Sequence, residues 1–186
     1  MFQGASNGQG RPDVAPKFRG THHQKVDGKG RVSVPATFRR VIEQGDPAWS
    51  EGQRPNFIIV YGLKYQKRLD CFTMRAMEEI DSNIDQLPPG SRTRKRLERI
   101  YHAHSQEAQI DEDGRIILSQ GLRDKLELIP DEKARFMGMN DHFQIWKNET
   151  YDLVFAEDED DEDEDLGPDY DPRILYAKTE TEQQDP

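Results

Sequence analysis

The sequence predicts a mixed α+β fold that is rich in β-structure and built from two similar halves. Three observations lead to this prediction: a motif that occurs twice, extended apolar segments that follow each copy, and short amphipathic helices between them. The motif is Asp-x-x-Gly-Arg, with one copy at residues 27–31 and the other 84 residues later at residues 111–115.

The similarity between the two copies extends beyond the motif itself. At the same offset, apolar residues match apolar residues and arginine matches arginine: Val26 with Ile110, Val32 with Ile116, Val34 with Leu118, Phe38 with Leu122, and Arg39 with Arg123. Chance could repeat a short motif, but it seldom repeats the apolar positions in phase as well. An internal duplication is therefore predicted, and it bears on the whole fold.

Each copy predicts a strand, a tight turn, a second strand and a short helix. Aspartate and glycine favour the turn, because aspartate starts turns and glycine tolerates a positive φ. Val32 and Val34 alternate with polar residues as in a half-buried strand. Pro35 ends this strand, since it cannot donate a ladder hydrogen bond. The helix over residues 36–45 stops at Gly45, and Ser119 caps its counterpart.

Further strands and helices complete each half. Strands are predicted at four apolar segments: "NFIIVYG" (56–62), "RLDCFTM" (68–74), "RFMGMN" (135–140) and "HFQIW" (142–146). Three further helices are predicted over "TMRAMEEIDSNIDQL" (73–87), "SRTRKRLERIYHAHS" (91–105) and "NETYDLVF" (148–155), with Thr73 and Ser91 as caps of the first two.

Composition divides the chain into four segments. Residues 1–17 and 157–186 are poor in core-forming residues, so burial cannot offset the entropy of ordering them, and both are expected to be flexible. The first half is predicted at 18–103, with its core at about 22–73 and helices after it. The second half is predicted at 104–156.

The acidic net charge of the chain conceals a basic N-terminal region. The formal net charge is −10, but residues 157–186 alone carry 14 acidic and two basic side chains, a net of −12. Residues 17–40 hold seven basic side chains and only Asp27 against them. Local positive charge decides whether a polyanion is attracted, so this region is a candidate nucleic-acid interface.

Other functional classes find little support in the sequence. Cys71 is the only cysteine, which excludes an intramolecular disulfide and fits a reducing cytosol. No apolar run has the length of a membrane span. His102 and His104 point to different faces of a helix, so no metal site is expected. With no cofactor motif and no base partner for Cys71, the chain is not expected to be an enzyme.

Six basic residues are candidates for DNA contact: Arg19, Lys25, Lys29, Arg31, Arg39 and Arg115. A hairpin can present such side chains to phosphates or to the major groove, which admits a two-stranded ribbon. Four motif residues are expected to be structural elements of the turns: Asp27, Gly30, Asp111 and Gly114. Asp27 could cap its turn, and Arg31 could pair with it instead of contacting DNA.

Two charged segments leave alternatives open. Glu112 and Asp113 replace Gly28 and Lys29 in the second turn, so the two halves are not expected to bind DNA equally. The basic residues 92–99 could contact DNA, pair with a neighbouring subunit or face solvent.

Several segments resemble the MraZ family of bacterial transcriptional regulators. They are "FRGTHHQKVDGKGRVSVPATFRRVI", "HSQEAQIDEDGRIILSQGLRDKL" and "FQIW", which together span about residues 18–151. The family has two AbrB-like (SpoVT-AbrB) halves, each marked by Asp-x-x-x-Arg. The resemblance implies swapped hairpins that form a double-psi-barrel-like unit, with short helices between and after.

The resemblance also implies a function. It indicates a repressor that binds double-stranded promoter DNA at direct repeats upstream of the division and cell-wall gene cluster, acting as a ring-like homo-oligomer in the cytoplasm and nucleoid. An oligomeric scaffold or an RNA-binding module on the same fold is the alternative. Residues 1–17 and the acidic tail depart from the family pattern. That tail either competes with DNA for the basic face or serves only solubility.

Overall fold

The computed structural model describes residues 16–163, with side chains through Phe155. Its two compact units are Met1–Asn148 and Glu149–Pro186. The second unit contains most of α5 (Asn148–Asp163), so this helix extends into the segment predicted as an acidic tail. Residues 1–15 and 164–186, where most of the two predicted flexible ends fall, lie outside the described residues.

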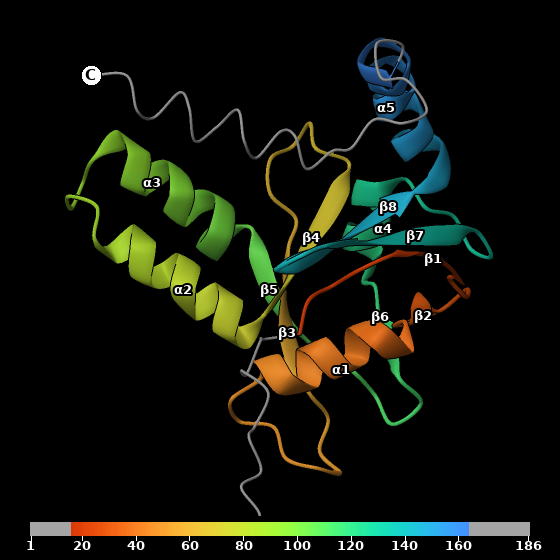
Figure 1. Ribbon diagram of the computed structural model, residues 1–186, viewed down its shortest axis with the longest axis horizontal. Coiled ribbons are helices and arrows are strands. Elements are labelled where there is room, and N and C mark those ends of the chain that lie inside the picture. The colour runs from red at the N-terminus through yellow and green to blue at the C-terminus, as the bar shows by residue number, and fades with distance from the viewer. Residues whose placement is uncertain (1–15, 164–186) are drawn as a thin grey trace, which may run out of the picture. The chain divides into compact units, whose positions relative to one another are not determined.

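The first unit is an antiparallel sheet with a small second sheet and short helices (Figure 1). The main sheet has the order β1 (Thr21–Lys25), β7 (Lys133–Met139), β8 (His142–Lys147), β4 (Arg68–Thr73), β3 (Asn56–Val60) and β5 (Ser105–Gln109). The second sheet pairs β2 (Arg31–Ser33) with β6 (Arg115–Ile117). The helical elements are α1 (Ala36–Gly45), α2 (Met74–Asp85), α3 (Arg92–Glu98), the π-helical η1 (Arg99–Ala103) and α4 (Gln120–Leu126).

These elements confirm the predicted α+β class and its β-rich character. The finer description, swapped hairpins in a double-psi-barrel-like unit, stays a prediction, as do the boundaries assigned to the two halves.

The strand order of the main sheet is symmetric. Each strand lies as far from one edge of the sheet as its counterpart in the other copy lies from the opposite edge. β1 corresponds to β5, β7 to β3, and β8 to β4. The outer strand of each copy pairs with the other copy, as β1 does with β7 and β5 with β3. The copies are therefore interleaved within one unit.

Local sequence signals position the helices as expected. The three predicted caps are confirmed, since the hydroxyl oxygens of Thr73, Ser91 and Ser119 accept N–H bonds of 3.1, 3.2 and 3.4 Å at the starts of α2, α3 and α4. The helix predicted over residues 91–105 is α-helical only as far as Glu98 and continues as the π-helical η1 to Ala103. It ends two residues earlier than predicted, because Ser105 already pairs with Val60 at the start of β5.

Phenylalanine rings fill the centre of the core. Phe143 lies within 5.1 to 6.0 Å, centroid to centroid, of the rings of Phe18, Phe38, Phe57 and Phe136, and all five side chains are fully buried. These rings come from both copies: Phe38 lies in α1, Phe57 in β3 and Phe136 in β7, and Phe18 precedes β1. Aromatic contacts of this kind add to the hydrophobic stabilisation from burial alone.

Replacing the central ring should destabilise the whole unit. Phe143→Ala is expected to lower the free energy of unfolding by about 3–5 kcal/mol, because it leaves a cavity among the other four rings. Chemical denaturation monitored by circular dichroism would measure this loss. Ile129→Ala removes a side chain that is 61% exposed and should change stability little. Equal effects of the two variants would contradict this description of the core.

Candidate nucleic-acid interface

The two copies of the motif fold into the same tight turn. In the first, the N–H of Asp27 donates to the carbonyl of Arg31 at 3.0 Å, and the N–H of Gly30 donates to the carbonyl of Asp27 at 2.9 Å. In the second, Asp111 bonds to Arg115 at 2.8 Å and Gly114 bonds to Asp111 at 2.9 Å in the same way. Each turn thus places an arginine at the first position of the following strand.

The Asp27 carboxylate organises the first turn. Its Oδ1 accepts the N–H groups of Lys29 and Arg31, each at 2.9 Å, and its Oδ2 accepts the Nε–H of Arg31 at 2.7 Å. The N–H of Arg31 is the main reason why the pKa of Asp27 lies below its usual value, and the Arg31 guanidinium adds to the effect. The pKa of Asp111 is lowered in the same way by the N–H of Arg115.

Each turn is also locked by an arginine from the other copy. Gly30 has φ +81°, and a Cβ there would lie 1.8 Å from Arg123 Nη1 and 2.3 Å from the carbonyl oxygen of Leu118. Gly114 has φ +75°, and its Cβ would lie 2.2 Å from Arg39 Nη1. Glycine is needed at both positions, because the conformation and the close packing each disfavour a side chain.

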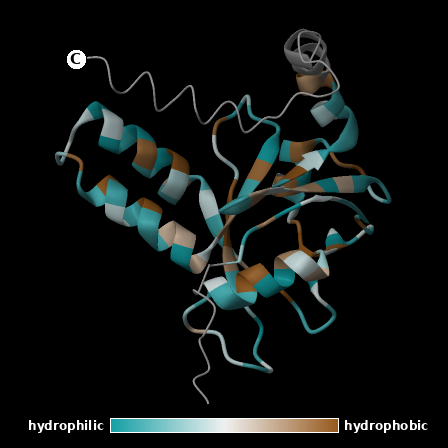
Figure 2. Ribbon diagram, viewed as in Figure 1, coloured by the Kyte–Doolittle hydropathy of each residue, from teal (hydrophilic) through white to brown (hydrophobic). Residues whose placement is uncertain are grey.

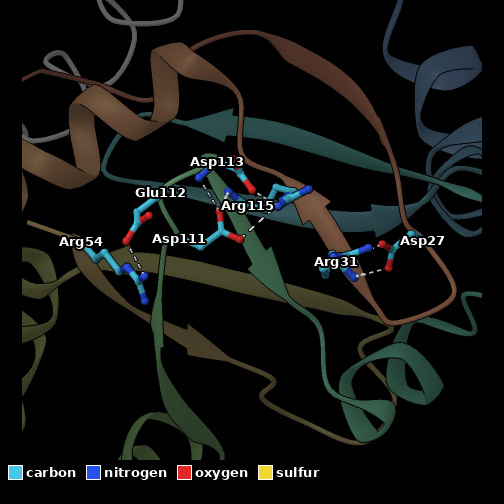
Figure 3. A network of polar contacts seen from close by, with 7 residues as sticks. All are labelled: Asp27, Arg31, Arg54, Asp111, Glu112, Asp113 and Arg115. Atoms are coloured by element: carbon cyan, nitrogen blue, oxygen red, sulfur yellow. Dashed lines mark hydrogen bonds and ion pairs between the residues drawn. The ribbon is translucent and has the colours of Figure 1, made fainter.

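The strands that follow the two turns form a short antiparallel ribbon. Arg31 lies opposite Ile117, Val32 opposite Ile116, and Ser33 opposite Arg115. Val32 and Ile116 are buried, so the neighbouring residues point to the opposite, outer face. Arg31 and Arg115 therefore share the outer face of the β2–β6 ribbon, each beside its own turn (Figure 3).

The first turn keeps cationic groups available for a ligand. Asp27 engages only the Nε of Arg31, and no partner is recorded among the described residues for the two terminal nitrogens. Lys29, at the tip of the turn, is exposed and its ammonium likewise has no partner in this part of the chain. Lys25 pairs with Asp131 at 2.7 Å, but both side chains are more than 60% exposed, so this ion pair is weak.

The second turn is occupied by its own carboxylates. Arg115 pairs with Asp113 through a terminal nitrogen, and its Nε lies 3.5 Å from Asp111 Oδ2. Glu112 pairs with Arg54 at 2.7 Å (Figure 3). With Asp111, Glu112 and Asp113 against one arginine, this turn has a formal charge of −2, whereas Asp27, Lys29 and Arg31 give the first turn +1.

The structure does not bring all six predicted DNA-contact residues together. Lys25, Lys29 and Arg31 lie at one turn, and Arg115 lies on the same ribbon face. Arg19 precedes the far end of β1, roughly 20 Å from Lys25 along an extended chain. Arg39 packs against Gly114, and its Nε is buried with no hydrogen-bond partner among the side chains and backbone that the structure describes.

One charged residue of the site escaped the sequence analysis. Arg54 lies in the loop between α1 and β3 and reaches the second turn across 58 positions in the chain. No motif or local pattern marks it, since its partner Glu112 is distant in sequence.

Other groups considered from the sequence lie elsewhere. Cys71 is buried in β4, and burial raises the pKa of its thiol. His102 bonds to Asp81 at 2.8 Å, while His104 stacks on Tyr61. Among the side chains that the structure describes, those of residues 16–155, no group of three or more potential ligands could hold a metal ion. Among the helices that the structure describes, none combines the length and apolar character that crossing a membrane requires.

The turn carboxylate should make stability depend on pH, and removing its charge should remove that contribution. Because the pKa of Asp27 is depressed in the folded chain, its stabilising effect is present above the unfolded value of about 3.9 and is lost as the pH falls below it. Asp27→Asn should therefore destabilise the protein at neutral pH, with a penalty that shrinks on acidification.

Thermal unfolding of both proteins over a series of pH values measures this. Glu78→Gln, which removes an exposed carboxylate on α2, is the matched control. A penalty for Asp27→Asn that stays constant down to acidic pH would show that the carboxylate charge does not stabilise the turn.

Comparison with known proteins places this architecture in one family. A family model described as "MraZ protein, putative antitoxin-like" matches residues 102–166. The chain is 47% identical over 156 residues to "Transcriptional regulator MraZ" of Ruegeria sp. (strain TM1040), covering 84% of this chain and 92% of the relative. The protein of the same name from Ruegeria pomeroyi is 48% identical over 162 residues, with coverages of 86% and 94%.

A more distant relative has the same name. "Transcriptional regulator MraZ" of Acidithiobacillus ferrooxidans is 32% identical over 135 residues, which are 73% of this chain and 85% of that protein. These are names of transcriptional regulators, not of enzymes. The duplicated turn, the interleaved strands and nearly full-length similarity to these relatives agree: the chain belongs to the MraZ family.

Proposed function

We propose that this protein is a transcriptional regulator that binds double-stranded promoter DNA in a sequence-specific manner through the β2–β6 ribbon. The observation that carries the proposal is the first turn, where Asp27 holds Arg31 by its Nε while the terminal nitrogens have no partner among the described residues. A side chain fixed in this way has lost its rotamer freedom before a ligand arrives.

The ribbon can supply both kinds of contact that recognition requires. A two-stranded ribbon fits the major groove, where an arginine can donate two hydrogen bonds to O6 and N7 of guanine. Arg31 takes this role. Lys29 and Lys25, which flank it on the same turn, contact phosphates and supply affinity that does not depend on sequence.

The two halves contribute unequally in this proposal. Arg115 occupies the equivalent position on the ribbon, but Asp111 and Asp113 surround it, and their charges repel phosphates. The first turn therefore reads the bases, whereas the second mainly completes the ribbon.

The remaining parts of the proposal concern assembly and context. One turn per subunit makes few contacts, so we propose that a ring-like homo-oligomer engages several direct repeats and gains avidity through effective concentration. Occupying a promoter in this way would repress transcription. The family resemblance suggests the division and cell-wall gene cluster as target and the cytoplasm and nucleoid as location.

Two single substitutions at equivalent positions test the proposed role of Arg31 in base recognition. Arg31→Ala should weaken binding to promoter DNA from the protein's own upstream region by roughly tenfold, and should weaken binding to random duplex much less, because a bidentate guanine contact is lost. Arg115→Ala removes the same charge from the same ribbon and should have a smaller effect on both. Fluorescence anisotropy titrations with the two duplexes provide the measurement.

Footprinting of the protein and of Arg31→Ala on the same region would show which protected bases depend on Arg31. If Arg31→Ala weakens binding to both duplexes equally, this arginine contacts only phosphate. If neither duplex binds with a steep dependence on salt, the regulator proposal itself fails.

A further inference from the structure

A second cationic surface lies on α3 and η1, apart from the ribbon. Arg92, Lys95, Arg96 and Arg99 follow the spacing i, i+3, i+4 and i+7, so they form one stripe along the helix. Figure 1 shows α3 on the opposite side of the unit from β2 and β6. The stripe is therefore not an extension of the DNA surface proposed above.

The four cations of this stripe have no ion-pair partner among residues 16–155, whose side chains the structure describes. Arg94, on a different side of the same helix, pairs with Asp85 and Glu98 at 2.8 Å each and donates to two backbone carbonyls. Among the residues that the structure describes, Arg94 is therefore held by contacts within the fold, whereas the four cations of the stripe are not. Like charges at these spacings repel one another, so the stripe costs stability unless an anion neutralises it.

These cations line an open groove of about 640 Å³. Besides the stripe, its lining residues are Leu63, Tyr65 and Gly90, and none of them is acidic. A groove with this lining attracts a polyanion and contains no internal carboxylate to compete for it.

Tyr65 gives the groove an aromatic surface. Its side chain is 74% exposed, which is unusual for a tyrosine in a small folded unit. The loop that carries it is anchored, because Lys125 Nζ and the N–H of Gln66 donate to the carbonyl of Leu63 at 2.5 and 3.0 Å, and Lys67 pairs with Glu127 at 2.5 Å. The backbone that carries the exposed ring is therefore anchored beside the basic stripe.

From these observations we propose that this groove binds a single-stranded nucleic acid. Phosphates lie against Arg92, Lys95, Arg96 and Arg99, and one base stacks on Tyr65. A basic groove that tracks a backbone beside an aromatic ring on which a base can stack is the usual chemistry of single-strand binding. A duplex keeps its bases stacked inside, so it could use the cations but not the ring.

Anisotropy titrations of the full chain with labelled single strands of about 12 nucleotides test this proposal. Oligodeoxyuridylate and oligouridylate, which differ only in the sugar, are the two probes, and the one that binds more tightly identifies the preferred sugar. Tyr65→Ala should weaken binding about fivefold or more through the lost stacking. Arg96→Ala should weaken binding and flatten the slope of log affinity against log salt by about 0.7, the value for one phosphate contact to a single strand.

Two controls make the result specific to the groove. Arg75→Ala removes an exposed charge from neighbouring α2 and should change neither affinity nor slope. Arg31→Ala should leave single-strand binding intact, so failure of the groove and failure of the ribbon proposal can be told apart.

Three results would overturn the proposal. One is no binding of either oligonucleotide at low salt. Another is binding that Tyr65→Ala leaves unchanged, because the groove would then hold phosphates alone. The third is equally effective displacement by polyglutamate, which would identify an acidic protein segment as the partner.

Discussion

The antiparallel pairing of β2 with β6 is the interaction on which the rest of the structure depends. It joins the two copies of the duplicated motif through reciprocal bonds, in which the N–H of Val34 donates to the carbonyl of Gly114 at 2.9 Å and that of Leu118 donates to Gly30 at 2.8 Å. The side chains are reciprocal as well: Arg39 packs closely on Gly114, and Arg123 packs closely on Gly30. Each turn is thus bonded to the residue that follows the strand of the other copy.

Equivalent backbones carry different charges in the two copies, and this difference is what the functional account uses. The same turn, the same aspartate and the same arginine recur, but Lys29 stands where the second copy has Asp113. Duplication thus provides a two-fold-like ribbon, and substitution at the turn tips gives its two turns formal charges of opposite sign. The α2 and α3 helices lie apart from this ribbon (Figure 1), and hydrophilic residues predominate in α3 (Figure 2).

Much of the local structure could be predicted from the sequence, because its signals are local. Pro35, Gly45 and the three cap residues mark element ends through the chemistry of neighbouring backbone groups. The repeat predicted two similar copies, but periodicity alone does not say that β1 pairs with β7 and β5 with β3. Long-range contacts such as Arg54 with Glu112, and the packing of Arg39 on Gly114, depend on the assembled fold.

Converting the second turn into the first is the most direct test of this account. The double substitution Glu112→Gly with Asp113→Lys gives both turns the same residues at these positions, frees Arg115 from Asp113 and changes the turn charge from −2 to +1. Affinity for the protein's promoter DNA should rise by about tenfold at low salt, with a steeper salt dependence. Unchanged affinity in a folded variant would contradict the claim that charge on the ribbon turns controls DNA binding.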